Sequence, residues 1–97
     1  MDIRRLTPGQ FFALNLDKGH MTAAQLATGI SYSTICDAKR GAELSVPTAR
    51  KLEEWSLGLA SAKAAGVCIG AAVAVGLAPA DKLPRKLARE MAAKAAA

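Results

Sequence analysis

The chain has 97 residues, of which 13 are basic and 8 are acidic, and its formal net charge is +5. A chain of this length can bury only one small hydrophobic core, which excludes a second folded core. The basic excess favours polyanionic partners but does not by itself indicate nucleic acid, because many small basic proteins bind no polyanion.

The first helix is predicted to begin at Pro8, because Thr7 is a preferred N-cap residue and proline is tolerated at the first helical position. We expect this helix to run to about Asp17 and to be stopped by Lys18 and Gly19, where glycine tolerates a left-handed cap. Its buried side is supplied by four apolar residues, which are Phe11, Phe12, Leu14 and Leu16.

A second, alanine-rich helix is predicted from Thr22, its expected N-cap, to about Thr28. Leu26 and Ala27 are its core candidates, and the small side chains of this segment allow close approach by the helix that follows. Gly29 then supplies a sharp turn.

The third helix carries the most informative pattern of the sequence. Ser31 is its expected N-cap, and the helix is predicted to end at Gly41. Ile35 and Ala38 fall on one side of it, where they can face a core. The polar residues around the rest of the helix are free to recognise a ligand, and they are Tyr32, Ser33, Thr34, Asp37, Lys39 and Arg40.

A fourth helix is predicted to open at Ser45, with Pro47 two positions later, and to end before Gly58. Its inward stripe consists of Ala49, Leu52 and Trp55. No alternating pattern of a β-strand competes with these helical signals. The sequence therefore predicts an all-α fold, a compact bundle of about five short helices with a central helix-turn-helix and an apolar C-terminal helical extension.

Residues 64–80 include no charged side chain. These seventeen residues reach only the lower limit for a membrane span and are dominated by alanine and glycine, so membrane insertion is not expected. We assign residues 61–80 to an apolar helical segment that forms a dimer, because a core of about sixty residues is marginal alone. The alternative is that the segment folds back and completes the core of a monomer. The candidate dimerisation residues are Val67, Ile69, Val73 and Leu77.

Residues 81–97 form a basic tail with five basic and two acidic side chains. Its composition is that of a strong helix former, and we expect it to be helical or disordered. It is either a frayed helix or a basic arm that follows a phosphate backbone.

Gly29, Ile30 and Ser31, followed by Thr34-Ile35 and Gly41, look like the turn and recognition helix of a helix-turn-helix. The chain resembles, over roughly residues 7 to 60, the helix-turn-helix family of phage Cro and CI repressors and the related bacterial XRE regulators.

Three further motifs extend the resemblance. Lys18 to Thr22 resemble the entry to the family's second helix, and Leu26-Ala27 resemble its Leu-Ala pair. Pro47 to Leu52, with Gly58, resemble the core helix that follows. One spacing departs from the family, because only Thr28 separates Ala27 from Gly29 where three residues are usual. Either the second helix is short, or Leu26-Ala27 is not the family's pair.

The resemblance implies that residues 1–60 form a Cro/CI-like domain that binds double-stranded DNA as a homodimer. Lys39 and Arg40 can contact phosphate or guanine, and Thr22 and Gln25 resemble family positions that touch the DNA backbone. The candidate DNA-binding residues are Thr22, Gln25, Ser31, Tyr32, Ser33, Thr34, Asp37, Lys39 and Arg40. The plainer alternatives are that Thr22 and Ser31 only cap helices, that Thr34 is half-buried, and that Lys39 and Arg40 only complement the helix dipole.

We therefore expect a sequence-specific DNA-binding transcriptional regulator, of the phage or mobile-element repressor type, that binds an operator as a dimer. The alternative is an antitoxin or another protein-interaction module with a Cro-like fold, in which residues 62–80 stay exposed for a protein partner. Catalysis is not expected, because the sequence has no carboxylate pair, Cys-His arrangement, phosphate loop or metal cluster.

Two cysteines, Cys36 and Cys68, lack the spacing of a metal knuckle or a secreted disulfide framework, which indicates a reducing compartment. His20 has no second ligand at metal-binding spacing, so neither a metal nor another cofactor is expected. The N-terminus lacks an apolar signal core, and we expect a cytoplasmic protein.

Overall fold

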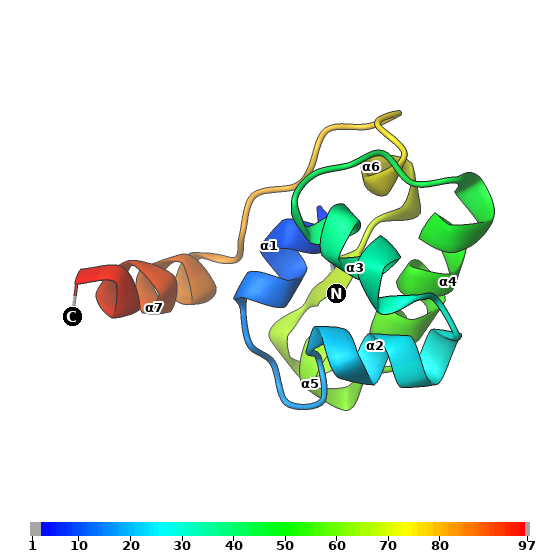
Figure 1. The fold of residues 1–97 in the computed structure, drawn as a ribbon. Coiled ribbons are helices and arrows are strands. Elements are labelled where there is room, and N and C mark those ends of the chain that lie inside the picture. Colours follow the sequence, from blue (N-terminus) through cyan, green and yellow to red (C-terminus); the bar gives the residue numbers. More distant parts are fainter. Residues whose placement is uncertain (1–2, 97) are drawn as a thin grey trace.

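Seven helices and two short strands follow one another along residues 3–96, which are the residues that this computed structural model describes (Figure 1). The elements in chain order are β1 (Arg4–Leu6), α1 (Pro8–Ala13), α2 (Met21–Thr28), α3 (Tyr32–Lys39), α4 (Val46–Leu57), α5 (Ala60–Ala65), β2 (Val67–Ile69), α6 (Ala71–Ala74) and α7 (Arg85–Ala96). The fold is mostly helical, as predicted, but it contains a small parallel sheet that the sequence analysis did not predict.

The two strands of this sheet pair in parallel, with Leu6 opposite Ile69. The other edge of β1 is bonded to Asp81, because the N–H of Arg5 donates to Asp81 Oδ2 over 2.8 Å and the N–H of Asp81 donates to the carbonyl oxygen of Arg5 over 2.9 Å. Sequence reasoning missed both strands, because three residues show no clear alternation and the fully buried β2 reads as a continuous apolar run.

Residues 61–80, which were predicted as one apolar helical segment, instead contribute to α5, β2 and α6. Gly66 ends α5 with a left-handed φ of 73°. Gly70 lies against β1, where a Cβ would come within 2.8 Å of the Cβ of Arg5. These two glycines therefore end a helix and allow a strand to approach.

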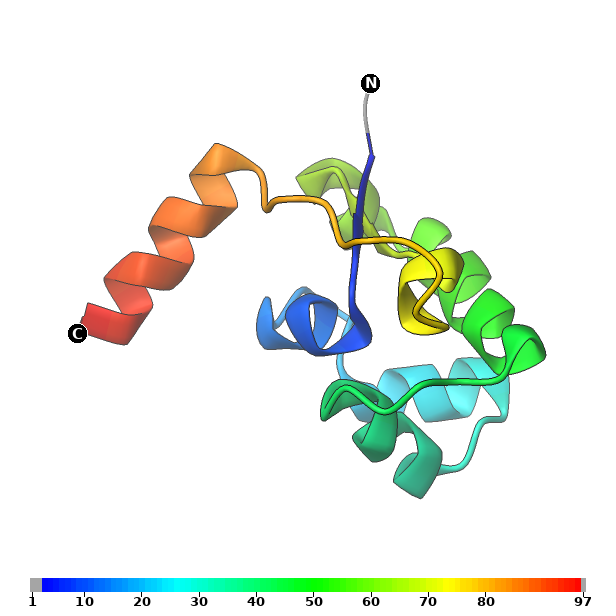
Figure 2. The ribbon, with the colours of Figure 1, turned by 90° about the horizontal axis from the view of Figure 1, so that it is seen from above.

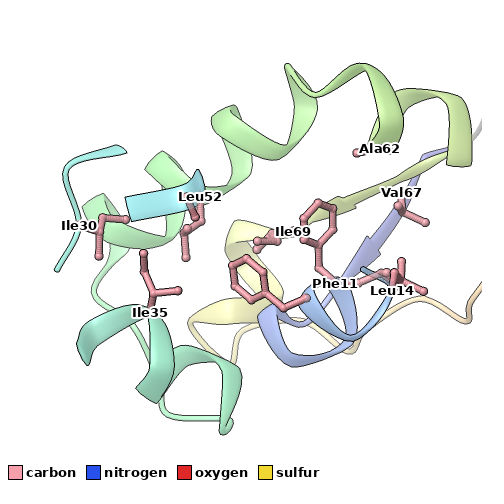
Figure 3. Packing of buried hydrophobic residues seen from close by; sticks show 11 residues of the cluster. Phe11, Leu14, Ile30, Ile35, Leu52, Ala62, Val67 and Ile69 are labelled. Carbon is pink, nitrogen blue, oxygen red and sulfur yellow. The ribbon is translucent and has the colours of Figure 1, made fainter. Parts of the chain in front are cut away.

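The hydrophobic core collects side chains from both strands and from α1 to α5 (Figure 3). The ring of Phe11 lies edge-to-face against those of Phe12 and Trp55, with both centroid distances at 5.8 Å. Such aromatic pairs contribute about 0.5 to 1.5 kcal/mol each beyond their burial. The buried members of the core are Leu6, Phe11, Phe12, Leu14, Ala24, Ile30, Ile35, Leu52, Ala62, Val67 and Ile69.

The start of α1 agrees with its prediction and its end does not. Thr7 Oγ1 accepts the N–H of Gln10 over 3.1 Å, and Gln10 Oε1 accepts the N–H of Thr7 over 3.0 Å, which completes a capping box. However, α1 ends at Ala13, well before Asp17. The left-handed residues that follow are Asn15 and Lys18, with φ of 51° and 58°, and not Gly19.

Two side chains of α4, those of Ser56 and Glu53, form hydrogen bonds that position β2 and α6. Ser56 is fully buried, and its Oγ donates to the carbonyl oxygen of Glu53 and accepts the N–H of Ile69, both over 2.9 Å. The Glu53 carboxylate accepts the N–H of Ala71 over 2.8 Å and so caps α6, whose own N-cap residue is Gly70. Helix α4 therefore fixes both β2 and α6.

The basic tail is helical from Arg85 to Ala96, and α7 extends from the rest of the molecule after an irregular linker (Figures 1 and 2). Leu83, Leu87 and Met91 recur every four residues and lie partly buried against the core. Within residues 3–96, no helix combines the length and the apolar character that crossing a membrane requires.

Replacing Ser56 by Ala removes the buried acceptor of the Ile69 N–H, and we expect a loss of about 1 to 3 kcal/mol in the free energy of unfolding. Urea denaturation followed by circular dichroism measures this loss. Ser45→Ala is the matched control. Ser45 is the N-cap residue of α4, but its exposed hydroxyl makes no capping hydrogen bond in the structure and bonds to Thr48 Oγ1 instead, so the change should stay within about 0.5 kcal/mol. Equal stability of the two variants would contradict the assigned role of Ser56.

Candidate nucleic-acid interface

Helices α2 and α3 are joined by the three-residue turn that the sequence predicted. Gly29 ends α2 with a left-handed φ of 76°, and Ile30 turns inward and is buried. Ser31 Oγ accepts the N–H of Thr34 over 3.3 Å and so caps α3. The turn thus anchors both helices to the core and lets α3 begin abruptly at Tyr32.

Helix α3 is seated through Ile35 and Ala38, which are both buried, as predicted. Its last turn also touches α1 very closely, because a Cβ on Gly9 would lie 2.6 Å from the carbonyl oxygen of Lys39. Only glycine permits this approach, and the contact holds the C-terminal end of α3 at a fixed position.

The outward face of α3 is polar. Tyr32, Ser33 and Asp37 are exposed, and Thr34 is half-buried. Thr34 Oγ1 lies 2.7 Å from Ser31 Oγ, so these two hydroxyls already bond to each other. Ser31 is thus engaged as a cap. Ser33 Oγ lies at the longer distance of 3.4 Å from Ser31 Oγ, and Tyr32 is exposed.

Two exposed cations, Lys39 and Arg40, mark the end of α3. Arg40 Nη1 lies 3.7 Å from Asp37 Oδ1, in an ion pair that is open to water. Pairs of this kind contribute about 1 kcal/mol or less, so the Arg40 guanidinium can exchange Asp37 for a phosphate or a base at little cost.

A hollow of about 340 Å³ separates the start of α2 from the end of α3. It is lined by Met21, Cys36, Lys39 and Arg40. Met21 and Cys36 were not expected at this place, because no local spacing in the sequence relates them.

The predicted contacts of α2 are only partly placed as expected. His20, and not Thr22, caps the helix, since His20 Nδ1 accepts the N–H of Ala23 over 3.1 Å. Thr22 is exposed in the first turn and Gln25 is half-buried. The cap was missed because histidine is not among the residues that favour this position.

The prediction that Leu26 and Ala27 belong to the core is wrong. Leu26 is 81% exposed and Ala27 is also exposed, whereas Ala24 is fully buried. The residue of α2 that faces the core is therefore Ala24, which lies two to three positions before Leu26 and Ala27 in the sequence. Helix α2 is indeed short, with 8 residues, and Leu26-Ala27 does not occupy the core position of the family's pair.

The four candidate dimerisation residues are separated by the fold. Val67 and Ile69 are buried in β2 within the chain itself, which matches the alternative in which the segment completes the core. Val73 is half-buried on α6, and Leu77 is 81% exposed. Leu77 is thus the one residue of the four that is largely open to a partner.

In comparisons with known proteins, no protein-family model, no curated protein and no solved structure matches this chain. A functional proposal for α2 and α3 therefore depends on the residues described above.

Replacing Gly9 by Ala places a Cβ against the carbonyl oxygen of Lys39, and we expect a loss of about 1 to 3 kcal/mol in the free energy of unfolding. Gly58→Ala is the control, because a Cβ there meets its nearest atoms at 3.6 Å and the φ of Gly58 is −82°. Thermal unfolding of both variants measures the difference. A stable Gly9→Ala protein would show that α1 does not fix α3.

The two cysteines should differ in reactivity. Burial raises the pKa of the Cys68 thiol, and the nearby Glu53 carboxylate raises it further, so little thiolate is present at neutral pH. Cys36 is only partly buried on α3. We expect a thiol reagent to modify Cys36 first in the folded protein and Cys68 only in denaturant, as checked by mass spectrometry of the labelled peptides. Faster labelling of Cys68 would contradict the burial of β2.

Proposed function

We propose that this chain is a sequence-specific DNA-binding regulator of transcription, of the phage or mobile-element repressor type, that binds an operator as a dimer. The observation that supports this function best is the construction of α3. Its inner side is fixed by Ile35 and Ala38, while its outer side offers hydroxyl groups and two cations. A regulator of this kind acts in the cytoplasm.

In this proposal α3 enters the major groove, which is about 12 Å wide and admits one helix. The N-terminal residues Tyr32 and Ser33 would meet base edges, as in helix-turn-helix recognition. Arg40 would contact a guanine or a phosphate after release from Asp37, and Asp37 could then accept a hydrogen bond from cytosine.

Helix α2 would contribute contacts to the phosphate backbone. Thr22 is exposed in its first turn, where free N–H groups and the helix dipole favour an anion. Lys39 lies across the hollow from the start of α2, so a phosphate between the two helices would meet positive potential from both sides. Gln25 is half-buried and would contribute less.

Two copies of α3 in a two-fold dimer would enter successive major grooves about 34 Å apart and read a pseudo-palindrome. Occupation of such an operator blocks or organises transcription.

The alternative of an antitoxin or another protein-interaction module required residues 62–80 to stay exposed. Part of that segment faces inward, because Ala62, Ala74 and the whole stretch from Val67 to Gly70 are buried, whereas the stretch from Gly76 to Pro79 is exposed. The buried strand β2 is therefore closed to a protein partner, and the apolar surface of the segment that stays open lies around Leu77.

Selection of bound sequences from a pool of random duplexes, followed by fluorescence anisotropy at several salt concentrations, tests this function. We expect an enriched pseudo-palindromic sequence and an affinity that falls steeply as salt rises, because bound cations release phosphate counterions. A protein that enriches no sequence and ignores duplex DNA at low salt would overturn the proposal.

We expect Arg40→Ala to weaken binding to the selected operator by about 1 to 3 kcal/mol and to relax specificity at one base pair, if its guanidinium meets guanine. Arg4→Ala is a matched control, because Arg4 is also exposed but lies on β1, away from α2 and α3. Equal affinities of the wild type and Arg40→Ala would remove Arg40 from the interface.

A further inference from the structure

An apolar groove of about 330 Å³ lies between α4 and α6, on a part of the surface that the DNA-binding proposal does not use. Helix α6 lies beside the first half of α4 in both ribbon views (Figures 1 and 2). The groove is lined by Val46, Ala49, Arg50, Glu53, Ala71, Ala72, Val75 and Leu77. Its volume is about twice that of the 150 Å³ cavity that holds a benzene molecule, so it has room for a large apolar side chain.

One wall of this groove carries a leucine with a fixed backbone and a free side chain. The N–H of Leu77 donates to the carbonyl oxygen of Ala72 over 2.9 Å, and Gly76 turns the chain just before it with a φ of 78°. The side chain of Leu77 is nevertheless 81% exposed, and Val46 on the opposite wall is 49% exposed. The same surface thus offers both a protruding apolar side chain and an apolar groove, which is what a two-fold interface requires.

The charges beside the groove are also complementary to each other. Arg50 lies on the α4 wall, whereas the carboxylate of Glu43 lies next to Gly76, where a Cβ would be 3.2 Å from Glu43 Oε1. Among the side chains that the structure describes, neither Arg50 nor Glu43 forms an ion pair. Glu53, the other charged residue of the groove, is already engaged in capping α6.

We propose that this groove is the surface through which two copies of the chain form a two-fold dimer. Leu77 of each copy inserts into the groove of the other, and Arg50 meets the partner's Glu43. A second copy supplies the apolar side chain and the opposite charge together, so no other molecule is needed to complete the surface. The inference rests on the proposed function in one respect, because this dimer is the species that would read two half-sites.

A backbone hydrogen bond links the groove to the loop that follows α3. The loop between α3 and α4 is tied to α6 by a hydrogen bond from the N–H of Leu44 to the carbonyl oxygen of Ala74, over 3.3 Å. A dimer built on α4 and α6 would therefore hold its two α3 helices at a defined separation.

Sedimentation velocity of the full chain over a range of concentrations tests the dimer. We expect the wild type to dimerise and Leu77→Asp to raise the dimer dissociation constant at least about 30-fold, as for a central interface residue. Leu26→Asp is the matched control, because Leu26 is equally exposed at 81% but lies on α2. A monomeric wild type, or equal effects of the two substitutions, would overturn the proposal.

Charge reversal tests the two-fold pairing without changing an apolar residue. Arg50→Glu and Glu43→Arg should each weaken the dimer, and the double variant should recover most of the wild-type affinity. Circular dichroism of all three variants verifies that the helices are intact. A double variant as weak as either single one would overturn the pairing of Arg50 with Glu43.

The same samples separate this inference from the proposed function when random duplex DNA is added at low salt. A dimer that ignores DNA and is weakened by Leu77→Asp but not by Leu26→Asp would overturn the DNA-binding proposal and support the groove as the dimer surface. A wild-type monomer that binds DNA would overturn the groove proposal and the dimeric part of the proposed function, and would leave DNA binding itself supported.

Discussion

The buried hydrogen bond between the Ile69 N–H and Ser56 Oγ is the constraint from which much of the architecture follows, because it fixes β2 against α4. Strand β2 then pairs with β1, and β1 leads directly into Thr7, the cap of α1. Helix α1 in turn meets the last turn of α3 through the contact at Gly9. The position of the candidate recognition helix thus depends on a hydroxyl group that lies outside α2, α3 and the turn between them.

The same helix α4 also supports the second surface. Its Glu53 caps α6, and α6 forms one wall of the groove in which Leu77 is exposed. Because a helix of 4 residues is too short to be stable by itself, α6 depends on this carboxylate and on the packing of Ala74. Helix α4 therefore supports both proposed interfaces. It positions α3 indirectly, through β2, β1 and α1, and it positions the groove through the cap of α6.

The parts of the fold that were predictable are those set by neighbours in sequence. Thr7, Gly29 and Ser31 act within three residues of the positions they control, so their roles were visible in the sequence. Strand β1 could not be found in this way, because its partner β2 is more than sixty residues distant. The error at Leu26 has a similar origin, since the core-facing side of α2 is decided by what α3 and α4 place beneath it.

The proposed interface of one copy is modest, and this explains why the groove matters for function. Helix α3 is only 8 residues long, and the cations at its end are Lys39 and Arg40. Phosphate contacts by these cations carry little sequence information, so a single copy of α3 would discriminate poorly between sequences. When two copies are joined through the groove, binding of the second α3 becomes intramolecular and gains a high effective concentration. In the proposed function, affinity for an operator is thus decided as much by Leu77 and Arg50 as by the residues that touch DNA.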